Sequence, residues 1–173
     1  MLMQVESRLT GAPSLVEPSA GGGLVGLPLA SATIASGGNV WVADLCRKRL
    51  ANGKHFMVFN VVDVGTGQWI IGQVRSHFSS TAVIGDLENA GRKYALPDRL
   101  LVRNFVGSGR SDLTQWGRTR GVDVVQDAVI SSVDGVGLSK KPDGQRFTSL
   151  EQVQRSVDKW RRAFSRIERG RLH

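Results

Sequence analysis

The run HFMVFNVV, residues 55–62, decides the fold because it is apolar at nearly every position. Such continuous apolar character is typical of a strand that is covered on both faces of its sheet. Shorter apolar runs stand before and after it, VWVADL at 40–45 and WIIGQV at 69–74, and turn residues separate the three runs. The sequence therefore predicts an antiparallel meander of three strands with helices packed on it.

The rest of the chain alternates helical and strand patterns. Apolar residues recur at helical spacing from Val83 to Tyr94, behind the N-cap candidates of 79–81 and ahead of Pro97. Three further runs predict a strand, a short helix and a strand: LLV at 100–102, SDLTQWGRTRG at 111–121 and VDVV at 122–125. We expect an α/β fold whose mixed five-stranded sheet joins the antiparallel meander to two parallel strands and is flanked by helices.

The last helix has the clearest pattern. Residues 148–151, Thr-Ser-Leu-Glu, have the form of a capping box. Apolar residues then step by three and four along one face: Leu150, Val153, Val157, Trp160, Phe164 and Ile167. Residues 1–37 are rich in Gly, Ser and Pro, which predicts a poorly ordered arm. We therefore expect the folded domain over 38–173, ending in this long basic helix.

The 173-residue chain carries a formal net charge of +8. Its last 34 residues hold ten Lys and Arg against four Asp and Glu. Such a segment favours polyanions as partners, among them nucleic acid bound through its phosphates without sequence preference. A solvated helix face is the alternative interpretation. The candidates for nucleic-acid binding are Lys140, Lys141, Arg155, Lys159, Arg162, Arg166 and Arg169.

Other reactive residues give no pattern of chemistry. Cys46 is the only cysteine, which excludes an internal disulfide and a cysteine-based zinc site. His55, His77 and His173 have no neighbours at metal-ligand spacing. The glycines of 106–112 lack the ending of a phosphate-binding loop, which favours a plain loop. Because no stretch matches a signal peptide or a membrane span, we expect a cytoplasmic protein without a membrane partner.

Short pieces spread in order over residues 39–168 resemble the catalytic core of retroviral integrases and bacterial insertion-sequence transposases. These pieces are Trp41-x-x-Asp44, Val61-Val62-Asp63, Trp69-Ile70-Ile71-Gly72, Ala95-Leu96-Pro97, Trp116, Arg120-Gly121-Val122, Phe147-x-Ser149-Leu150-Glu151 and Trp160-Arg161-Arg162-x-Phe164. The resemblance implies a ribonuclease-H-like fold and a relation to DNA integration and transposition. It also implies a metal site that can be compared with this sequence residue by residue.

Cores of this family use three carboxylates to hold two divalent ions, Mg²⁺ or Mn²⁺, that act on a DNA phosphodiester. The resemblance places the first acid at Asp44 and puts Asn104, a neutral amide, where the second acid stands. Arg103 beside it repels a cation. The third acid belongs on a helix after the fifth strand, but residues 126–146 contain three glycines and a proline, which is poor helix material. Of the acids in that segment, Asp127 and Asp134 are the candidate substitutes, and we interpret them as solvated turn residues.

These deficits predict an integrase-like core without catalytic activity, without a cofactor, and with at most non-specific affinity for nucleic acid. One alternative is an active metal-dependent strand-transfer enzyme or nuclease that uses Asp44 and a loop acid with Mg²⁺ or Mn²⁺. Another is a truncated module that regulates a full-length transposase by hetero-oligomerisation. The expected partners are DNA, further copies of the chain and related transposase subunits.

Overall fold

The computed structural model describes the backbone of residues 38–105, 108–126 and 147–171, and the side chains of these residues except Ser108 and 164–171. The elements follow in the order β1 (Val40–Arg49), β2 (His55–Asp63), β3 (Trp69–Arg75), α2 (Ser80–Tyr94), β4 (Arg99–Arg103), α3 (Ser108–Arg120), β5 (Asp123–Gln126) and α4 (Leu150–Arg171). The predicted arm over 1–37 and the irregular segment over 127–146 lie outside the described residues.

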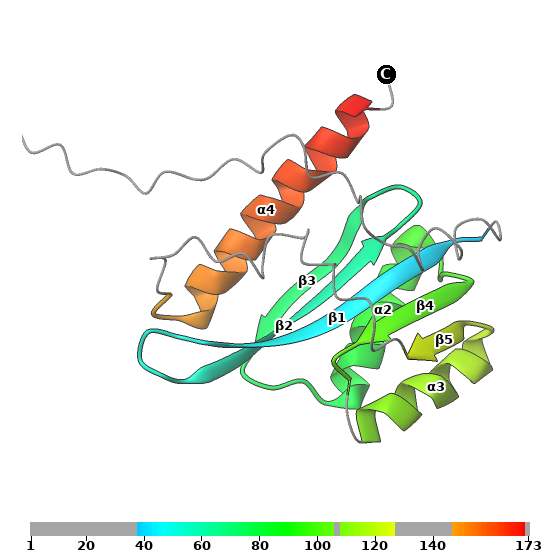
Figure 1. Ribbon diagram of the computed structural model, residues 1–173, viewed down its shortest axis with the longest axis horizontal. Helices are drawn as coiled ribbons and strands as arrows, with labels where there is room; N and C mark the ends of the chain where they lie inside the picture. Colours follow the sequence, from blue (N-terminus) through cyan, green and yellow to red (C-terminus); the bar gives the residue numbers. More distant parts are fainter. Residues whose placement is uncertain (1–37, 106–107, 127–146, 172–173) are drawn as a thin grey trace, which may run out of the picture.

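The five strands form one mixed sheet in the order β3-β2-β1-β4-β5 (Figure 1). β2 pairs antiparallel with both β1 and β3, whereas β4 pairs parallel with both β1 and β5. This arrangement confirms the predicted sheet of a meander plus two parallel strands. Because β1 and β4 are parallel neighbours, their carboxyl ends meet at the same edge of the sheet.

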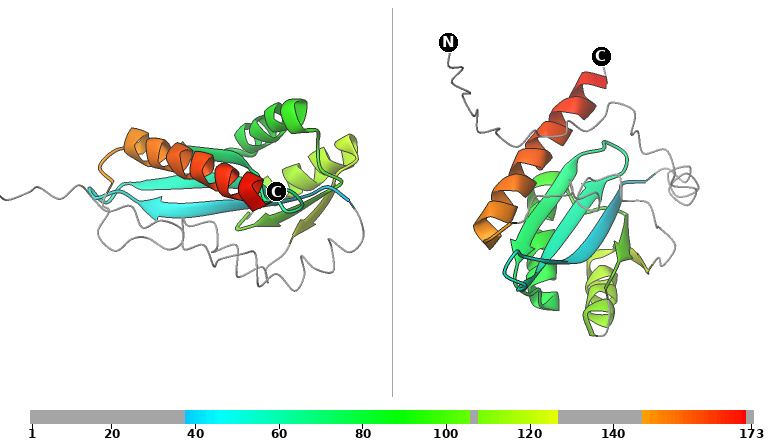
Figure 2. Two further views of the ribbon diagram at one scale, coloured as in Figure 1. Left: turned by 90° about the horizontal axis from the view of Figure 1, so that it is seen from above. Right: turned by 60° about the vertical axis from the view of Figure 1, so that its left-hand side comes forward.

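Helices pack on both faces of the sheet. On one face, Trp41, Phe59 and Leu100 are buried in a core with residues of α2 and α3. On the other face, Phe56 and Val58 are buried against α4. Figures 1 and 2 show α4 alongside β3, at the opposite side of the sheet from α3 and β5. The alternating side chains of β2 thus face helices on both sides, as the continuous apolar run predicts.

A glutamine of α4 fixes this helix to the outer strand. Gln154 Oε1 accepts a hydrogen bond from the backbone N–H of Val74 at 2.8 Å, and its Nε2 donates to the carbonyl of Gly72 at 2.9 Å. Both backbone groups lie on β3, an edge strand, so Gln154 satisfies groups that an edge otherwise leaves open. A Cβ atom on Gly72 would lie 2.7 Å from Val157 Cγ1, so this close approach requires glycine.

A carboxylate ties α2 to α3 on the other face. Glu88 Oε1 accepts hydrogen bonds from Trp116 Nε1 at 2.7 Å and from Arg120 Nε at 2.6 Å. The bond from Trp116 is the main reason why the pKa of Glu88 lies below its ordinary value. These contacts hold together the two helices that begin at the edge where β4 ends.

Two predicted boundaries are wrong. β1 was expected to end at 45 but runs to Arg49, because its polar end pairs with β2 as far as the pair Arg49 and His55. α3 begins at Ser108 rather than 111, although residues 106–112 were expected to form a loop. A tertiary contact supports its first turn, since Arg110 Nε donates to Gln126 Oε1 at 3.1 Å.

The cap of α4 is displaced by one residue from the predicted capping box. Ser149 Oγ accepts the backbone N–H of Gln152 at 3.3 Å, and Gln152 Oε1 accepts the backbone N–H of Thr148 at 2.8 Å. Ser149 is therefore the N-cap, and Gln152 accepts from the residue before that cap, so Gln152 rather than Glu151 supplies the returning side chain. No helix in the described ranges is sufficiently long and apolar to span a bilayer.

Candidate functional site at the carboxyl edge of the sheet

Asp44 and Asn104 lie together at the carboxyl end of β4, where the pairing of β4 with β1 stops. Asp44 is the register partner of Arg103, the last residue of β4, and Asn104 follows directly. Asn104 has a φ of 60°, a left-handed conformation that asparagine tolerates better than most residues. The turn brings its side-chain amide to Asp44 of β1. The sequence-based placement of these two residues at one site is consistent with this geometry.

Both carboxylate oxygens of Asp44 accept hydrogen bonds. Asn104 Nδ2 donates to Oδ1 at 2.6 Å, and Cys46 Sγ donates to Oδ2 at 2.8 Å. The amide therefore presents its donor, and not its oxygen, to Asp44. Both oxygens of this carboxylate thus have a donor from the protein itself.

Cys46 is a part of the site that the sequence interpretation missed. Burial raises the pKa of the Cys46 thiol to about 12, and the hydrogen bond to Asp44 and the negative charge of that residue add to the effect. The thiol consequently stays protonated at neutral pH and acts as a donor. Its position two residues after Asp44 on the same strand was the available signal, since residues i and i+2 share a face.

The side chains in this part of the molecule do not fit a pair of divalent ions. Such ions need several anionic oxygen ligands. Within the described ranges, no three His, Cys, Asp or Glu side chains gather closely enough to hold a metal ion. Arg103 Nη1 is buried and has no hydrogen-bond partner among these residues. An unpartnered guanidinium nitrogen requires an acceptor and disfavours a cation nearby. Asp127 and Asp134 lie outside the described residues.

The candidate nucleic-acid ligands are only partly described. Arg155, Lys159 and Arg162 are exposed on α4, whereas Val153 and Val157 of the same helix are buried against the sheet. These cations therefore form the solvent-facing side of the helix, as the apolar stripe predicts. Lys140 and Lys141, together with the side chains of Arg166 and Arg169, lie outside the described part of the chain.

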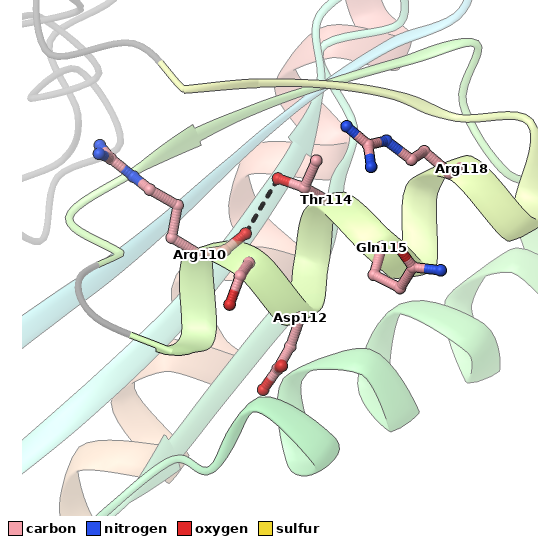
Figure 3. A pocket seen from close by; sticks show the side chains of 6 residues that line it. Arg110, Asp112, Thr114, Gln115 and Arg118 are labelled. Carbon is pink, nitrogen blue, oxygen red and sulfur yellow. Dashed lines mark hydrogen bonds between the residues drawn. The ribbon is translucent and has the colours of Figure 1, made fainter.

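Two hollows in the described part of the surface differ in their relation to this site. Figure 3 shows a shallow one along α3, between Arg110 and Arg118, whose lining residues all come from that helix. It contains neither Asp44 nor Asn104. A second hollow, of about 630 Å³, is lined by Asn104 and Cys46 together with basic and histidine residues of β1, β2 and the turn before α2. The second hollow is the one that adjoins the candidate site.

No family model and no curated protein matches the sequence, but solved structures match its shape. The catalytic domain of Mos1 mariner transposase aligns at a TM-score of 0.51 and 16% identity, over 75% of this chain and 75% of that one. The same domain with raltegravir and magnesium gives 0.50 and 17%, over 75% and 76%.

A chain in the simian T-cell lymphotropic virus intasome, in complex with PP2A regulatory subunit B56 gamma, aligns at a TM-score of 0.50 and 13% identity. This match covers 70% of the present chain and 47% of that chain, so it spans about half of its length. At these identities the likeness establishes the fold. The chain has the ribonuclease-H-like fold of integrase and transposase catalytic cores.

The carboxyl edge of this sheet is the position at which a ligand site is expected. Asp44 and Asn104 occupy the edge formed by its parallel strands, the place where ligands usually bind in open α/β sheets. One Mos1 structure carries magnesium and another carries manganese. In the present chain, an amide and a thiol bind Asp44 at the carboxyl edge, and Arg103 is its register partner on β4.

Proposed function

We propose that this chain is an integrase-like or transposase-like core protein that has lost metal-dependent DNA cleavage and strand transfer and that binds nucleic acid non-specifically. The observation that carries the proposal is the hydrogen bonding of the Asp44 carboxylate. Its two carboxylate oxygens accept hydrogen bonds from Asn104 and Cys46, at 2.6 Å and 2.8 Å.

Loss of activity follows from the chemistry of phosphodiester cleavage. Activating an attacking oxygen and stabilising a leaving oxygen needs concentrated positive charge on bound ions, and those ions need anionic ligands that hold them together. Asn104 adds no negative charge, and Arg103, the register partner of Asp44 on β4, adds a positive one. The edge therefore favours an anion over a metal ion.

Non-specific nucleic-acid binding is supported by charge. The chain carries a net charge of +8, and Arg155, Lys159 and Arg162 form a row on the exposed side of α4. Contacts between such cations and phosphates supply affinity without reading base sequence. By analogy with the viral neighbour, which is described as part of an intasome, we also propose pairing with further copies of the chain or with related transposase subunits.

A strand-nicking assay tests the catalytic part of the proposal. With a supercoiled plasmid and increasing Mg²⁺ or Mn²⁺, the wild-type chain is expected to give no more nicked product than Asp44→Ala, because neither has ligands for an ion pair. A salt titration of duplex binding accompanies it, and we expect the affinity to fall steeply with salt. Nicking that depends on metal and disappears in Asp44→Ala would show an active, rearranged site.

A further inference from the structure

The β1–β2 hairpin carries a concentration of positive charge that the sequence interpretation did not single out. Residues 45–62 contain Arg47, Lys48, Arg49 and Lys54, and no Asp or Glu. Arg47, Arg49, Lys54 and the adjacent His55 are exposed, and Lys48 is half-buried. We call Arg47, Lys48, Arg49, Lys54 and His55 the basic hairpin.

The basic hairpin extends beyond the end of β4. β4 pairs with β1 only as far as Asp44, so residues 45–49 continue past the end of β4, paired on the other side with β2 (Figure 1). β3 pairs with β2 from Met57 onward, so this part of the sheet is three-stranded as far as Arg47 and two-stranded only at Lys48 and Arg49. Residues 45–49 therefore form an exposed strand edge, from which cations can reach the phosphates of a duplex.

The basic hairpin is held firmly at its far end. Leu50 is buried in the core beneath α4, and the backbone N–H of Ala51 donates to the carbonyl of Phe147, just before that helix, at 2.8 Å. Its cations are therefore carried on a fixed support and need little ordering when they bind. A preformed set of positive charges suits the regular spacing of the phosphates along a nucleic-acid backbone.

Among the described residues, no ion pair neutralises the cations of the basic hairpin. The ion pairs found among the described residues involve Arg75, Arg99 and Arg120. The side-chain contact of the hairpin cations is between Arg49 Nη2 and His55 Nε2, at 3.5 Å. Charges that are left unpaired in this way are available to an external anion.

The neighbouring hollow is also suited to anions. Arg47, Lys48, His55 and His77 line it together with Asn104. Arg103 Nη1, on the neighbouring strand β4, is a buried donor without a hydrogen-bond partner among the described residues. The nearby carboxylate of Asp44 already accepts two hydrogen bonds, and no Asp or Glu is among the residues described as lining this hollow. Positive charge therefore outweighs negative charge around the hollow.

We propose that the basic hairpin is the principal contact surface for duplex DNA, with its cations placed against the phosphate backbones. This inference rests on the nucleic-acid part of the proposed function and assigns that binding to β1 and β2 rather than mainly to α4. The ordinary alternative is that basic residues on an exposed edge prevent strand-to-strand association between copies.

Matched charge changes test this assignment by fluorescence anisotropy with a labelled duplex. The hairpin variant is Arg47→Gln, Lys48→Gln and Arg49→Gln. Its control is Arg92→Gln, Lys93→Gln and Arg118→Gln, three exposed residues near the carboxyl ends of α2 and α3. A third variant, Arg155→Gln, Lys159→Gln and Arg162→Gln, measures the contribution of α4. All three lose the same charge.

The hairpin variant is expected to lose about tenfold or more in affinity for DNA at about 100 mM salt. The slope of its log Kd plotted against the logarithm of the salt concentration should fall by about 2 to 3. The control should lose about threefold or less, and the α4 variant less than the hairpin variant. Equal losses in the hairpin and control variants, or a larger loss in the α4 variant, would overturn the assignment. Aggregation of the hairpin variant with unchanged DNA affinity would do the same.

Two further readouts keep the outcomes separate. If circular dichroism shows that the hairpin variant does not fold, Lys54→Gln at the exposed turn replaces it, and the salt slope should fall by about 1.

If the wild-type chain shows no salt-dependent DNA binding, the nucleic-acid part of the proposed function fails. If it binds DNA but the control and hairpin variants behave alike, only the hairpin assignment fails. Binding to anionic vesicles in preference to DNA would also overturn it.

Discussion

Replacing Asn104 by aspartate is expected to destabilise the folded chain at neutral pH by about 1 kcal/mol, because a solvent-exposed hydrogen bond is lost and an exposed like-charge pair is created. The wild-type amide donates to Asp44 Oδ1 at 2.6 Å. In Asn104→Asp, a second carboxylate takes the place of that donor, and the two negative charges repel each other. The free energy of unfolding in urea at pH about 7 measures the loss.

The pH dependence of Asn104→Asp separates charge repulsion from a general defect. Repulsion makes the folded carboxyl pair hold a proton more tightly than the unfolded chain does, so the pKa of the pair is raised on folding. Its stability is then retained below the ordinary carboxyl range of about 4 and is lost as the pH rises toward 7. The control Asn104→Gly tolerates the positive φ and removes the donor without adding charge. If both variants lost the same free energy of unfolding at pH about 4 and at pH about 7, this explanation would be contradicted.

Cys46 is expected to be alkylated about fiftyfold more slowly in the native chain than in urea at pH about 8. Burial and Asp44 raise its pKa from 9.0 to about 12, which lowers the thiolate fraction about a thousandfold. The greater nucleophilicity of a more basic thiolate recovers part of that factor. Because Cys46 is the only cysteine, mass spectrometry of iodoacetamide adducts follows this site alone.

Asp44→Asn provides the control for Cys46. It removes the negative charge that adds to the effect of burial, so alkylation should become faster but remain slower than in urea. The folded pKa lies above the unfolded one, so the stability that the thiol contributes is complete below pH about 9 and is lost as the pH rises toward about 12. Native Cys46 that reacts as fast as the unfolded chain would show that the thiol is neither buried nor bound to Asp44.

The spacing of apolar residues predicted the helices and strands, because in most of them that spacing follows from which side chains face the core. Phe56, Val58, Phe59 and Val61 alternate between two buried faces, and that is why 55–62 reads as a covered strand. The end of β1 could not be predicted in the same way. Arg47 to Arg49 are polar, and only pairing with β2, distant along the chain, keeps them in a strand.

The candidate site was predictable in its location but not in its bonding. The parallel pairing of β1 with β4 stops at Asp44 and Arg103 and so places Asp44 beside Asn104, and that pairing follows from element order. The direction of the Asn104 amide depends on its turn, with a φ of 60°, which spacing does not reveal. In the sequence, Cys46 belongs to no pattern of chemistry because it is the only cysteine, although its hydrogen-bond partner is a carboxylate two residues away.

Thermal unfolding of the wild-type chain during a Mn²⁺ titration tests most directly whether Asp44 has been withdrawn from metal binding. An ion that binds only the folded state at one hundred times its Kd would stabilise it by about 2.7 kcal/mol. We predict no saturable rise in Tm, and the same flat response in Asp44→Asn. A saturable rise in the wild-type chain that is absent in Asp44→Asn would contradict the account.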